Sequence, residues 1–479
     1  MSTAQRRLVR WARYTLGAVA CGLVLGGCVN SAGLLPSGKP LDVAAVANDT
    51  TFTGWPEQHW WTVFSDPALD ALIEHALVAS PDLELARARI DMADAAIGFT
   101  HSRLSPQVSF GVDSTYQRYS EHGQNRKLAG DGGSDNRLEF RGNYELDFFG
   151  RNRAALAAAT SNARASAASQ QAVRVAVASA VARAYFDLAR LIAEHQVVSD
   201  TRLQRQKILK LVQSRVAEGL DSKVELRQAE GALPVIDGEL ALLEENIDLL
   251  RSLIGKLAVV EPSVTATLAP TLAKVAAPSL PSTIPSDLLA RRADISAARW
   301  EIEATTRGTE VIKAEFYPRV NLTAFAGIAA LGVSSLFEAG AGTLGVNPSV
   351  SLPIFDADRL RSKLKFADAQ VDRAIAEYNA ALLNAMQDVV HAVTSLRALE
   401  HRQAAQVAAQ AAAESAYDLA VQRYKAGLTG YLTVLATESE VLEQRRAATA
   451  LKARALLLNV ELNRALGGGF DAATMTASN

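Results

Sequence analysis

Sulfur-containing residues are scarce in this chain, and their scarcity limits its chemistry. The 479 residues include two cysteines and four methionines. Cys21 would be removed with the N-terminal segment described below, and the remaining Cys28 could form no disulfide within its own chain. Four methionines, Met1 among them, provide no ladder of thioether ligands for copper or silver ions.

Sequence motifs of nucleotide-driven and hydrolytic enzymes are missing as well. The phosphate-binding pattern G-x-x-x-x-G-K-[ST] is absent, because Gly255-Lys256 lacks the upstream glycine and a following Ser or Thr. Neither H-E-x-x-H nor G-x-S-x-G occurs, and the seven histidines are scattered. Residues 340–345 match G-x-G-x-x-G but lead into a predicted strand, so we expect no dinucleotide site. An enzyme is the least supported class.

Positive charge is concentrated at the N-terminus, where it predicts a lipoprotein signal segment over residues 1–27. Four arginines precede an apolar stretch from Tyr14 to Leu25, which is shorter than the ~20 residues of a transmembrane helix. Leu25-Gly26-Gly27-Cys28 resembles a lipobox, whose cysteine receives diacylglycerol and N-acyl groups. A cleavable signal with an incidental cysteine is the alternative. No aspartate follows Cys28, which favours the outer membrane.

The formal net charge is −2, and no basic cluster follows the N-terminal arginines. This distribution argues against nucleic acid as a partner.

The chain consists of two similar halves. Pro106 matches Pro318, Phe149 matches Phe355 and Gly219 matches Gly427, at nearly one offset of about two hundred residues, too long for a solenoid unit. The matching segments are 102–112 with 315–325, 144–153 with 350–359, and 215–230 with 423–438. An internal two-fold repeat indicates that function resides in the architecture, not in a catalytic motif.

Each half contains two segments with the alternation of apolar and polar residues that is typical of a β-strand. They form predicted hairpins at about 106–148 and 318–355, with strands of ~10 residues, the length of a tilted strand that crosses a bilayer. We expect polar connections at 120–136 and 327–343. A soluble sheet with one wet face has the same alternation, so both interpretations stay open. Pro348 is unfavourable in the last strand, because it cannot donate a ladder hydrogen bond.

Long helices are predicted after each hairpin. The first half has helices at 151–218 and 224–256 around a turn at 219–222, and the second half has helices at 359–426 and 431–466 around a turn at 427–430. Shorter helices are predicted at 55–77, 81–104 and 287–314. Coiled-coil spacing in the first long helix involves Val177, Val181, Ala184, Leu188, Leu191, His195 and Val198. We expect His195 and the aromatic side chains of Trp60, Trp61 and Phe64 to pack, not to bind a ligand.

These elements divide the chain into six parts. The predicted parts are the signal segment 1–27, an N-terminal segment 28–80, a first repeat 81–256, a proline-rich connector 257–286, a second repeat 287–466 and a C-terminal tail 467–479.

Four strands cannot close a membrane barrel, because the smallest barrels have eight. An open edge cannot face lipid, where each unpaired backbone group costs several kcal/mol. If the strands span a membrane, several chains must share one barrel.

Several motifs resemble the TolC-type outer membrane factor family, in particular its lipoprotein branch serving RND-type tripartite efflux systems. They are the doubled pattern, the lipobox at Cys28, W-W-x-x-F-x-D-P at 60–67 and RRADI at 291–295. The family usually has proline where this chain has Ala293, which we interpret as a variation at a helix start.

This resemblance implies a mixed α/β membrane protein that forms a homotrimer. Its chains would share a twelve-stranded transmembrane β-barrel, joined to a long α-helical coiled-coil tunnel in the periplasm. The termini and the connector would form an equatorial belt. The resemblance also implies a passive exit duct for drugs or other small toxic compounds. A periplasmic membrane-fusion adaptor and an inner-membrane RND transporter would deliver them, and the lipid on Cys28 would be the sole attached group.

By the same resemblance, the two helix turns form the periplasmic mouth. Gly219, Leu220, Gly427 and Leu428 are the expected adaptor contacts. Glycine at these turns also has a plain structural use as a helix terminator.

For the pore constriction we expect Leu432, helped by Tyr424 and Arg423. Ordinary coiled-coil packing is the alternative for these side chains. Relatives commonly have Asp and Arg at the positions of Ala436 and Ser439, so a polar lock at that level is in doubt.

Three further interpretations stay open. A periplasmic coiled-coil scaffold lipoprotein would not need the strands. A duct for type I protein secretion would keep the channel and change the cargo, and so would a duct for metal ions.

Overall fold

The computed structural model describes five stretches of the chain: residues 33–41, 55–122, 130–272, 291–353 and 356–471. The signal segment, Cys28 and much of the connector lie outside these residues. The chain forms two compact units. Unit 1 comprises residues 1–40, 89–166 and 297–378, and unit 2 comprises residues 41–88, 167–296 and 379–479.

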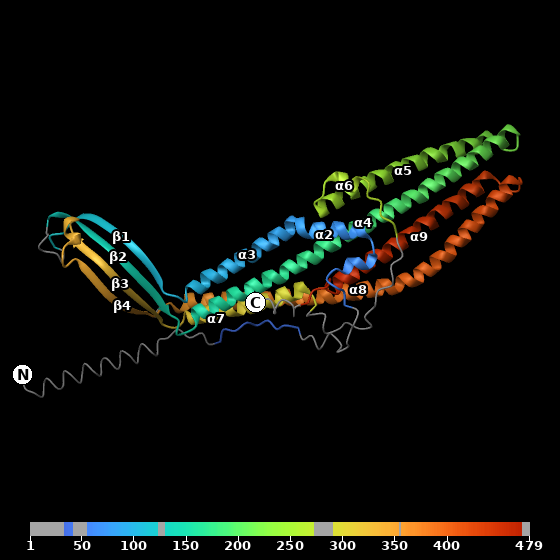
Figure 1. Ribbon diagram of the computed structural model, residues 1–479. Coiled ribbons are helices and arrows are strands. Elements are labelled where there is room, and N and C mark those ends of the chain that lie inside the picture. Colours follow the sequence, from blue (N-terminus) through green and yellow to red (C-terminus); the bar gives the residue numbers. More distant parts are fainter. Residues whose placement is uncertain (1–32, 42–54, 123–129, 273–290, 354–355, 472–479) are drawn as a thin grey trace, which may run out of the picture. The chain divides into compact units, whose positions relative to one another are not determined.

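The same order of elements occurs in both halves of the chain. It runs α3 (Pro81–Ser102), β1 (Gln107–Arg118), β2 (Gly132–Leu146), α4 (Arg151–Ala217) and α5 (Lys223–Ala258) in the first half. In the second half it runs α7 (Ala293–Ala314), β3 (Arg319–Leu331), β4 (Gly342–Ser351), α8 (Ala357–Lys425) and α9 (Tyr431–Ala465). The fold is therefore mostly helical with a small sheet (Figure 1).

Unit 1 contains one antiparallel sheet in the order β1-β2-β3-β4. Its register aligns Phe110 with Phe140, Phe140 with Ala326, and Ala326 with Leu344. These residues lie on one face, so the apolar positions of all four strands coincide there. Within the described chain, β1 and β4 each lack a strand partner on their outer side.

The strands are longer than predicted at the hairpin ends. β2 begins at Gly132 and β3 continues to Leu331, both inside the segments expected to be polar connections. The paired backbones of Arg118 and Gly132 extend the ladder despite the glycines. Pro348 does lie within β4, opposite Leu322. Its place on the edge strand of the sheet limits the cost of the missing donor.

The N-terminal stretch of unit 1 is fixed to α8. Asp372 accepts hydrogen bonds from the backbone N–H groups of Ser37 and Gly38, both at 2.7 Å, and from the Ser37 hydroxyl at 2.8 Å. These bonds lower the pKa of Asp372, since they stabilise its ionised form. Leu34 packs against the buried cluster of Phe316, Leu360 and Leu364.

Unit 2 is built around the coiled coil of α4 and α5. Val181, Leu188 and Val198 are fully buried, which confirms the predicted seam of α4. His195 approaches Glu244 on α5, with Nε2 and Oε1 3.4 Å apart. The seam also packs against residues of α9, such as Leu456.

The helix predicted at 55–77 is wrong in its first part. Residues Trp60–Phe64 form a 3₁₀ helix, and α2 covers Pro67–Ala79. The first element ends at Ser65, which has a left-handed backbone, and Asp66 then starts α2 because its side chain accepts from the N–H groups of Ala68 and Leu69. The three aromatic side chains at 60, 61 and 64 are buried in the core, as predicted.

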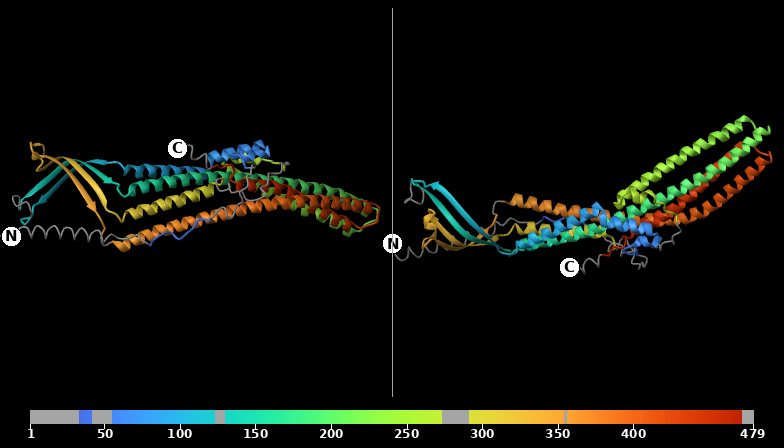
Figure 2. Two further views of the ribbon diagram at one scale, coloured as in Figure 1. Left: turned by 90° about the horizontal axis from the view of Figure 1, so that it is seen from below. Right: turned by 45° about the horizontal axis from the view of Figure 1, so that its top comes forward.

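The four long helices of unit 2 follow one another in the order α5, α4, α9, α8 (Figure 1 and Figure 2). The short helix α6 (Pro262–Ala266) follows α5. Side-chain bonds join each pair of neighbours. Those bonds are Arg202 to Asp237 for α4 and α5, Arg205 to Glu438 for α4 and α9, and Gln406 to Gln444 for α8 and α9.

The start of α7 is connected to the end of α9 within unit 2. Ala293 is the first residue of α7, a position where proline is also tolerated, so the variation at this site changes little. The buried Arg292 donates to Ala465 O at 3.1 Å and to Asp388 at 3.2 Å. It therefore holds the last carbonyl of α9.

Gly467 follows this junction and has a φ of +96°. A Cβ atom at this position would lie 1.7 Å from the carbonyl oxygen of Arg291. We expect Gly467→Ala to lower the free energy of unfolding by about 2 kcal/mol or more, because the backbone must shift. Denaturant unfolding in mild detergent measures this change.

Gly98→Ala is the matched control, since Gly98 lies within α3 and a Cβ there meets nothing within 4 Å. Alanine should be tolerated or slightly stabilising at this helical position. Equal unfolding midpoints for the two variants would contradict the close packing at Gly467.

Candidate functional site: the helix tips

The two helix turns in unit 2 have the same backbone geometry. Gly219 has a φ of +71° and Gly427 a φ of +75°. The N–H of Leu220 donates to Arg215 O, and the N–H of Leu428 donates to Arg423 O, each at 2.8 Å. This is the Schellman arrangement, which a residue without a Cβ enters at least cost. The predicted structural use of both glycines is confirmed.

The two turns differ in how the following helix begins. Ser222 caps α5 by accepting from Val224 N, and its own N–H donates to Glu225 at 3.0 Å, which completes a capping box. Gly430 precedes α9 without a side-chain cap. The first turn is therefore more strongly fixed than the second.

A polar cluster of Arg215, Asp221 and Tyr424 joins the two turns. Arg215 Nε lies 2.9 Å from Asp221 Oδ2, and the Tyr424 hydroxyl donates to the same oxygen. The guanidinium carbon of Arg215 lies 4.7 Å from the centre of the Tyr424 ring, a cation–π distance. This tip cluster connects the end of α8 to the turn between α4 and α5.

The tip cluster shifts the ionisation of its members. Burial opposes the ionised form of Asp221, but the hydrogen bonds from Arg215 and Tyr424 outweigh it and lower the pKa of that carboxyl. Burial, aided by the bond to Asp221, raises the pKa of Tyr424. Asp221 is therefore a carboxylate and Tyr424 a neutral donor at neutral pH.

The structure corrects the expected role of Tyr424. Its side chain is fully buried between the helices, so it cannot line a passage directly. Arg423 is exposed and stands apart from the tip cluster. The matched arginines of the two turns thus differ, since Arg215 is buried in an ion pair and Arg423 is not.

The remaining predicted side chains do lie on the surface of the chain. Leu220, Leu428 and Leu432 are 60%, 68% and 66% exposed. Three large apolar side chains at one end of unit 2 are available for contacts outside the chain.

The polar lock expected in relatives has no equivalent at Ala436 and Ser439. Ser439 donates to Leu435 O of its own helix at 2.9 Å. The buried charge on this part of α9 is Glu438 instead. Its spacing from Val434 and Val441 puts Glu438 on the buried face of α9, but the sequence gives no sign of its partner.

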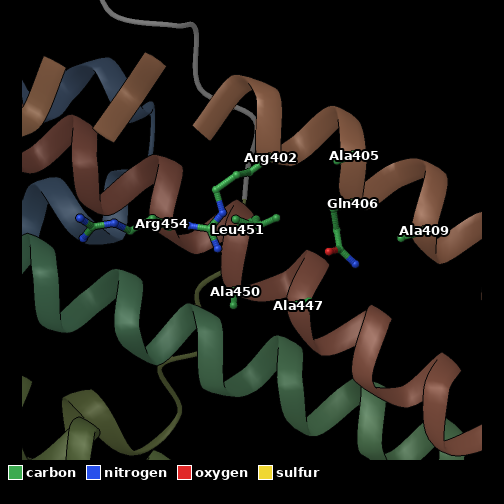
Figure 3. Close-up of a pocket in the computed structure, with 8 residues that line it drawn as sticks. All are labelled: Arg402, Ala405, Gln406, Ala409, Ala447, Ala450, Leu451 and Arg454. Atoms are coloured by element: carbon green, nitrogen blue, oxygen red, sulfur yellow. The ribbon is translucent and has the colours of Figure 1, made fainter. Parts of the chain in front are cut away.

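An open cavity lies between α8 and α9, roughly four helical turns from the second tip (Figure 3). Its volume is about 570 Å³. It is lined by Arg402, Ala405, Gln406, Ala409, Ala447, Ala450, Leu451 and Arg454. Small alanine side chains on both helices leave this space unfilled, and Gln406 bonds to Gln444 beside it.

Within the residues that the structure describes, no group of three or more His, Cys, Asp or Glu side chains could hold a metal ion. The same part of the chain has no helix that is both long and apolar enough for a membrane span.

Comparison with known proteins identifies the class to which this arrangement belongs. Residues 72–248 and 284–468 match the family described as "Outer membrane efflux protein". The chain belongs to this family.

Relatives resemble the chain over nearly its whole length. The multidrug resistance outer membrane protein MdtQ of Escherichia coli O157:H7 is 30% identical over 476 residues, which cover 95% of this chain and 98% of that protein. The pyoverdine export outer membrane protein OpmQ of Pseudomonas putida is 30% identical over 429 residues, 88% of this chain and 90% of that one.

A solved structure shares the fold. The outer membrane protein VceC of Vibrio cholerae aligns with a TM-score of 0.82 and 34% identity, covering 87% of this chain and all of that one. The predicted resemblance to outer membrane factors is confirmed.

We expect Asp221→Asn to loosen the first turn, because Arg215 loses its ionic partner. Hydrogen exchange of the amides at residues 219–221, followed by mass spectrometry, should become about tenfold faster at neutral pH. The lowered pKa of Asp221 means that its contribution is present above the unfolded value of about 3.9 and is lost as pH falls through the folded value. The difference between variant and wild type should therefore disappear in stronger acid.

Glu218→Gln is the control, since it removes an exposed charge beside the same turn. If both variants exchanged alike, the tip cluster would not fix the turn.

Proposed function

We propose that this chain is the outer-membrane channel lipoprotein of a tripartite efflux system. It acts as a passive exit duct from the periplasm to the exterior, for drugs or other small toxic compounds. Membership of the outer membrane efflux protein family supports this role. The names of two relatives, which describe multidrug resistance and pyoverdine export, support small molecules as cargo.

The observation that carries the proposal is the sheet of unit 1. One face exposes large apolar side chains on β1, β2 and β4, among them Phe110 at 55%, Phe140 at 59% and Leu344 at 83%, and the small Ala326 on β3 lies in line with them. The other face carries Arg137, Glu139 and Asn143. Apolar side chains suit lipid, and charged ones suit a wet lumen.

The free edges of β1 and β4 support a shared barrel. In lipid, the backbone N–H and C=O groups at the edge of a sheet need hydrogen-bond partners, and the edge strand of another copy would provide them. Three copies with four strands each would close a barrel of twelve strands. A homotrimer in the outer membrane, extending into the periplasm as a coiled-coil tunnel, is therefore part of the proposal, as is the internal two-fold repeat.

The parts assigned from the sequence complete this proposal. The signal segment 1–27 is removed, and diacylglycerol and N-acyl groups on Cys28 anchor the chain. Residues 28–80, 257–286 and 467–479 form the belt around the tunnel, and the repeats 81–256 and 287–466 form the barrel and tunnel. No other cofactor and no nucleic acid take part.

The tips are the proposed partner surface. Leu220 and Leu428, with the glycines before them, contact a periplasmic adaptor, which connects the duct to an inner-membrane transporter of the RND type. Leu432 forms the constriction, with Arg423 near it. Tyr424 acts indirectly, because it holds the second turn through Asp221.

Planar-bilayer recording of the purified protein tests the duct. We expect the wild type to conduct ions weakly, and Leu432→Ala to raise the conductance about tenfold, because a large exposed side chain is removed from the constriction. A cell that carries Leu432→Ala should also become permeable to a large antibiotic.

Leu428→Ala is the matched control on the same turn. It should weaken binding of the adaptor in pull-down and leave the conductance unchanged. No current from any variant would overturn the duct, whereas current without an effect of Leu432→Ala would overturn only the constriction.

A further inference from the structure

Unit 2 contains a buried ion pair above the tips that no part of the proposed function uses. Arg205 on α4 donates through Nε to Glu438 Oε2 on α9 at 2.8 Å. The two side chains are only 11% and 4% exposed. The pair lies roughly three turns of α4 and two turns of α9 from the tips.

The same arginine also contacts α5. Its Nη1 donates to Ala232 O at 2.9 Å. Pro234 lies within α5 beside this contact and has no N–H, so the carbonyl of Glu230 loses its helical donor. Arg205 therefore links α4, α5 and α9 at a place where α5 lacks one backbone hydrogen bond.

Stability alone is a poor reason for this arrangement. A buried ion pair commonly gains little over apolar side chains of similar volume, because both charges lose water. Burial raises the pKa of Glu438, and Arg205 opposes this rise only in part. The other titratable groups that influence this region are Tyr417 and Tyr431, whose burial keeps them neutral. Arg205 is the cation that balances Glu438.

The position of the pair gives it a mechanical consequence. The ion pairs of Arg202 with Asp237 and of Arg445 with Glu414 join helices within one hairpin. The Arg205–Glu438 pair joins the hairpin of α4 and α5 to the hairpin of α8 and α9.

Other polar contacts make the same connection. At the tips, Tyr424 bonds to Asp221 and Arg215 donates to Lys425 O, and a more exposed pair joins Arg446 to Glu239. Of the two ion pairs that join the hairpins, Arg205 with Glu438 is more deeply buried than Arg446 with Glu239.

Along α9, the pair lies between Leu432 and the alanine-lined cavity. The cavity lies between α8 and α9 beside the bond from Gln406 to Gln444 (Figure 3). Leu432 lies on the same helix as Glu438, between the pair and the second turn. A shift of α9 at Glu438 would therefore carry Leu432 with it.

We propose that the Arg205–Glu438 ion pair positions the constriction, and that separation of this pair is a required step when the periplasmic end opens. Both are positioning residues that act through Leu432, so the proposal rests on the proposed duct. Binding of an adaptor at the tips would then leave the passage closed as long as Arg205 joins α9 to α4 and α5.

Methionine substitutions test this proposal in planar bilayers. Arg205→Met and Glu438→Met each leave one buried charge without its partner, so both should lower the thermal unfolding temperature and raise the open probability, roughly tenfold. The double variant R205M/E438M leaves no charge and similar volume. It should recover the unfolding temperature but keep the high open probability, since no ion pair then joins the two hairpins at this level.

The double variant separates positioning from stability. If it recovered wild-type open probability together with the unfolding temperature, the pair would act only through stability and the proposal would be wrong. It remains decisive if the single variants fail to fold. A wild type without current would instead overturn the duct itself.

Arg202→Met/Asp237→Met is the matched control. It removes an ion pair one turn away on α4, but one that lies within a single hairpin. This control should leave the open probability unchanged. A rise equal to that of R205M/E438M would also contradict the proposal.

Discussion

Backbone hydrogen bonding at the edges of a sheet is the constraint on which this molecule depends. Unit 1 offers four strands whose outer members, β1 and β4, have no partner in the described chain. The face that exposes Phe110 and Leu344 is apolar, so its contact with water would be unfavourable in a sheet without a further partner. A membrane would satisfy the apolar face and a neighbouring copy would satisfy the edges. In the proposed trimer, copies that share a barrel would also bring their long helices together.

Much of the fold was predictable because its signals are local. The glycines at 219 and 427 end α4 and α8 within a residue or two of the predicted bounds, since the positive φ of the Schellman turn favours glycine wherever it occurs. The seam through Leu188 was readable from its spacing. The ends of the two hairpins could not be predicted from the sequence. The pairing of Gly132 with Arg118 depends on the partner strand, which overrides the weak strand preference of glycine. Likewise, the cap made by Asp66 divides a helix that periodicity alone had joined.

The candidate site was predictable in place but not in its contacts. Leucines 220, 428 and 432 are exposed at the tips as expected. Tyr424 is not, because Asp221, distant in sequence, binds its hydroxyl and Arg215 covers its ring. The pairing of Arg205 with Glu438 spans still more of the chain. Such contacts arise when separate hairpins pack together, and no motif of neighbouring residues encodes them. The absence of the usual Asp and Arg at 436 and 439 was visible in the sequence, but the buried pair nearby was not.

The native mass of the protein extracted in mild detergent tests the shared barrel most directly. One chain has a mass of 51.0 kDa. Light scattering coupled to size exclusion, corrected for detergent, should give a protein mass near three chains, and heating should convert this species to single chains. A stable monomer would contradict the account, because four strands with two free edges would then have to remain unpaired.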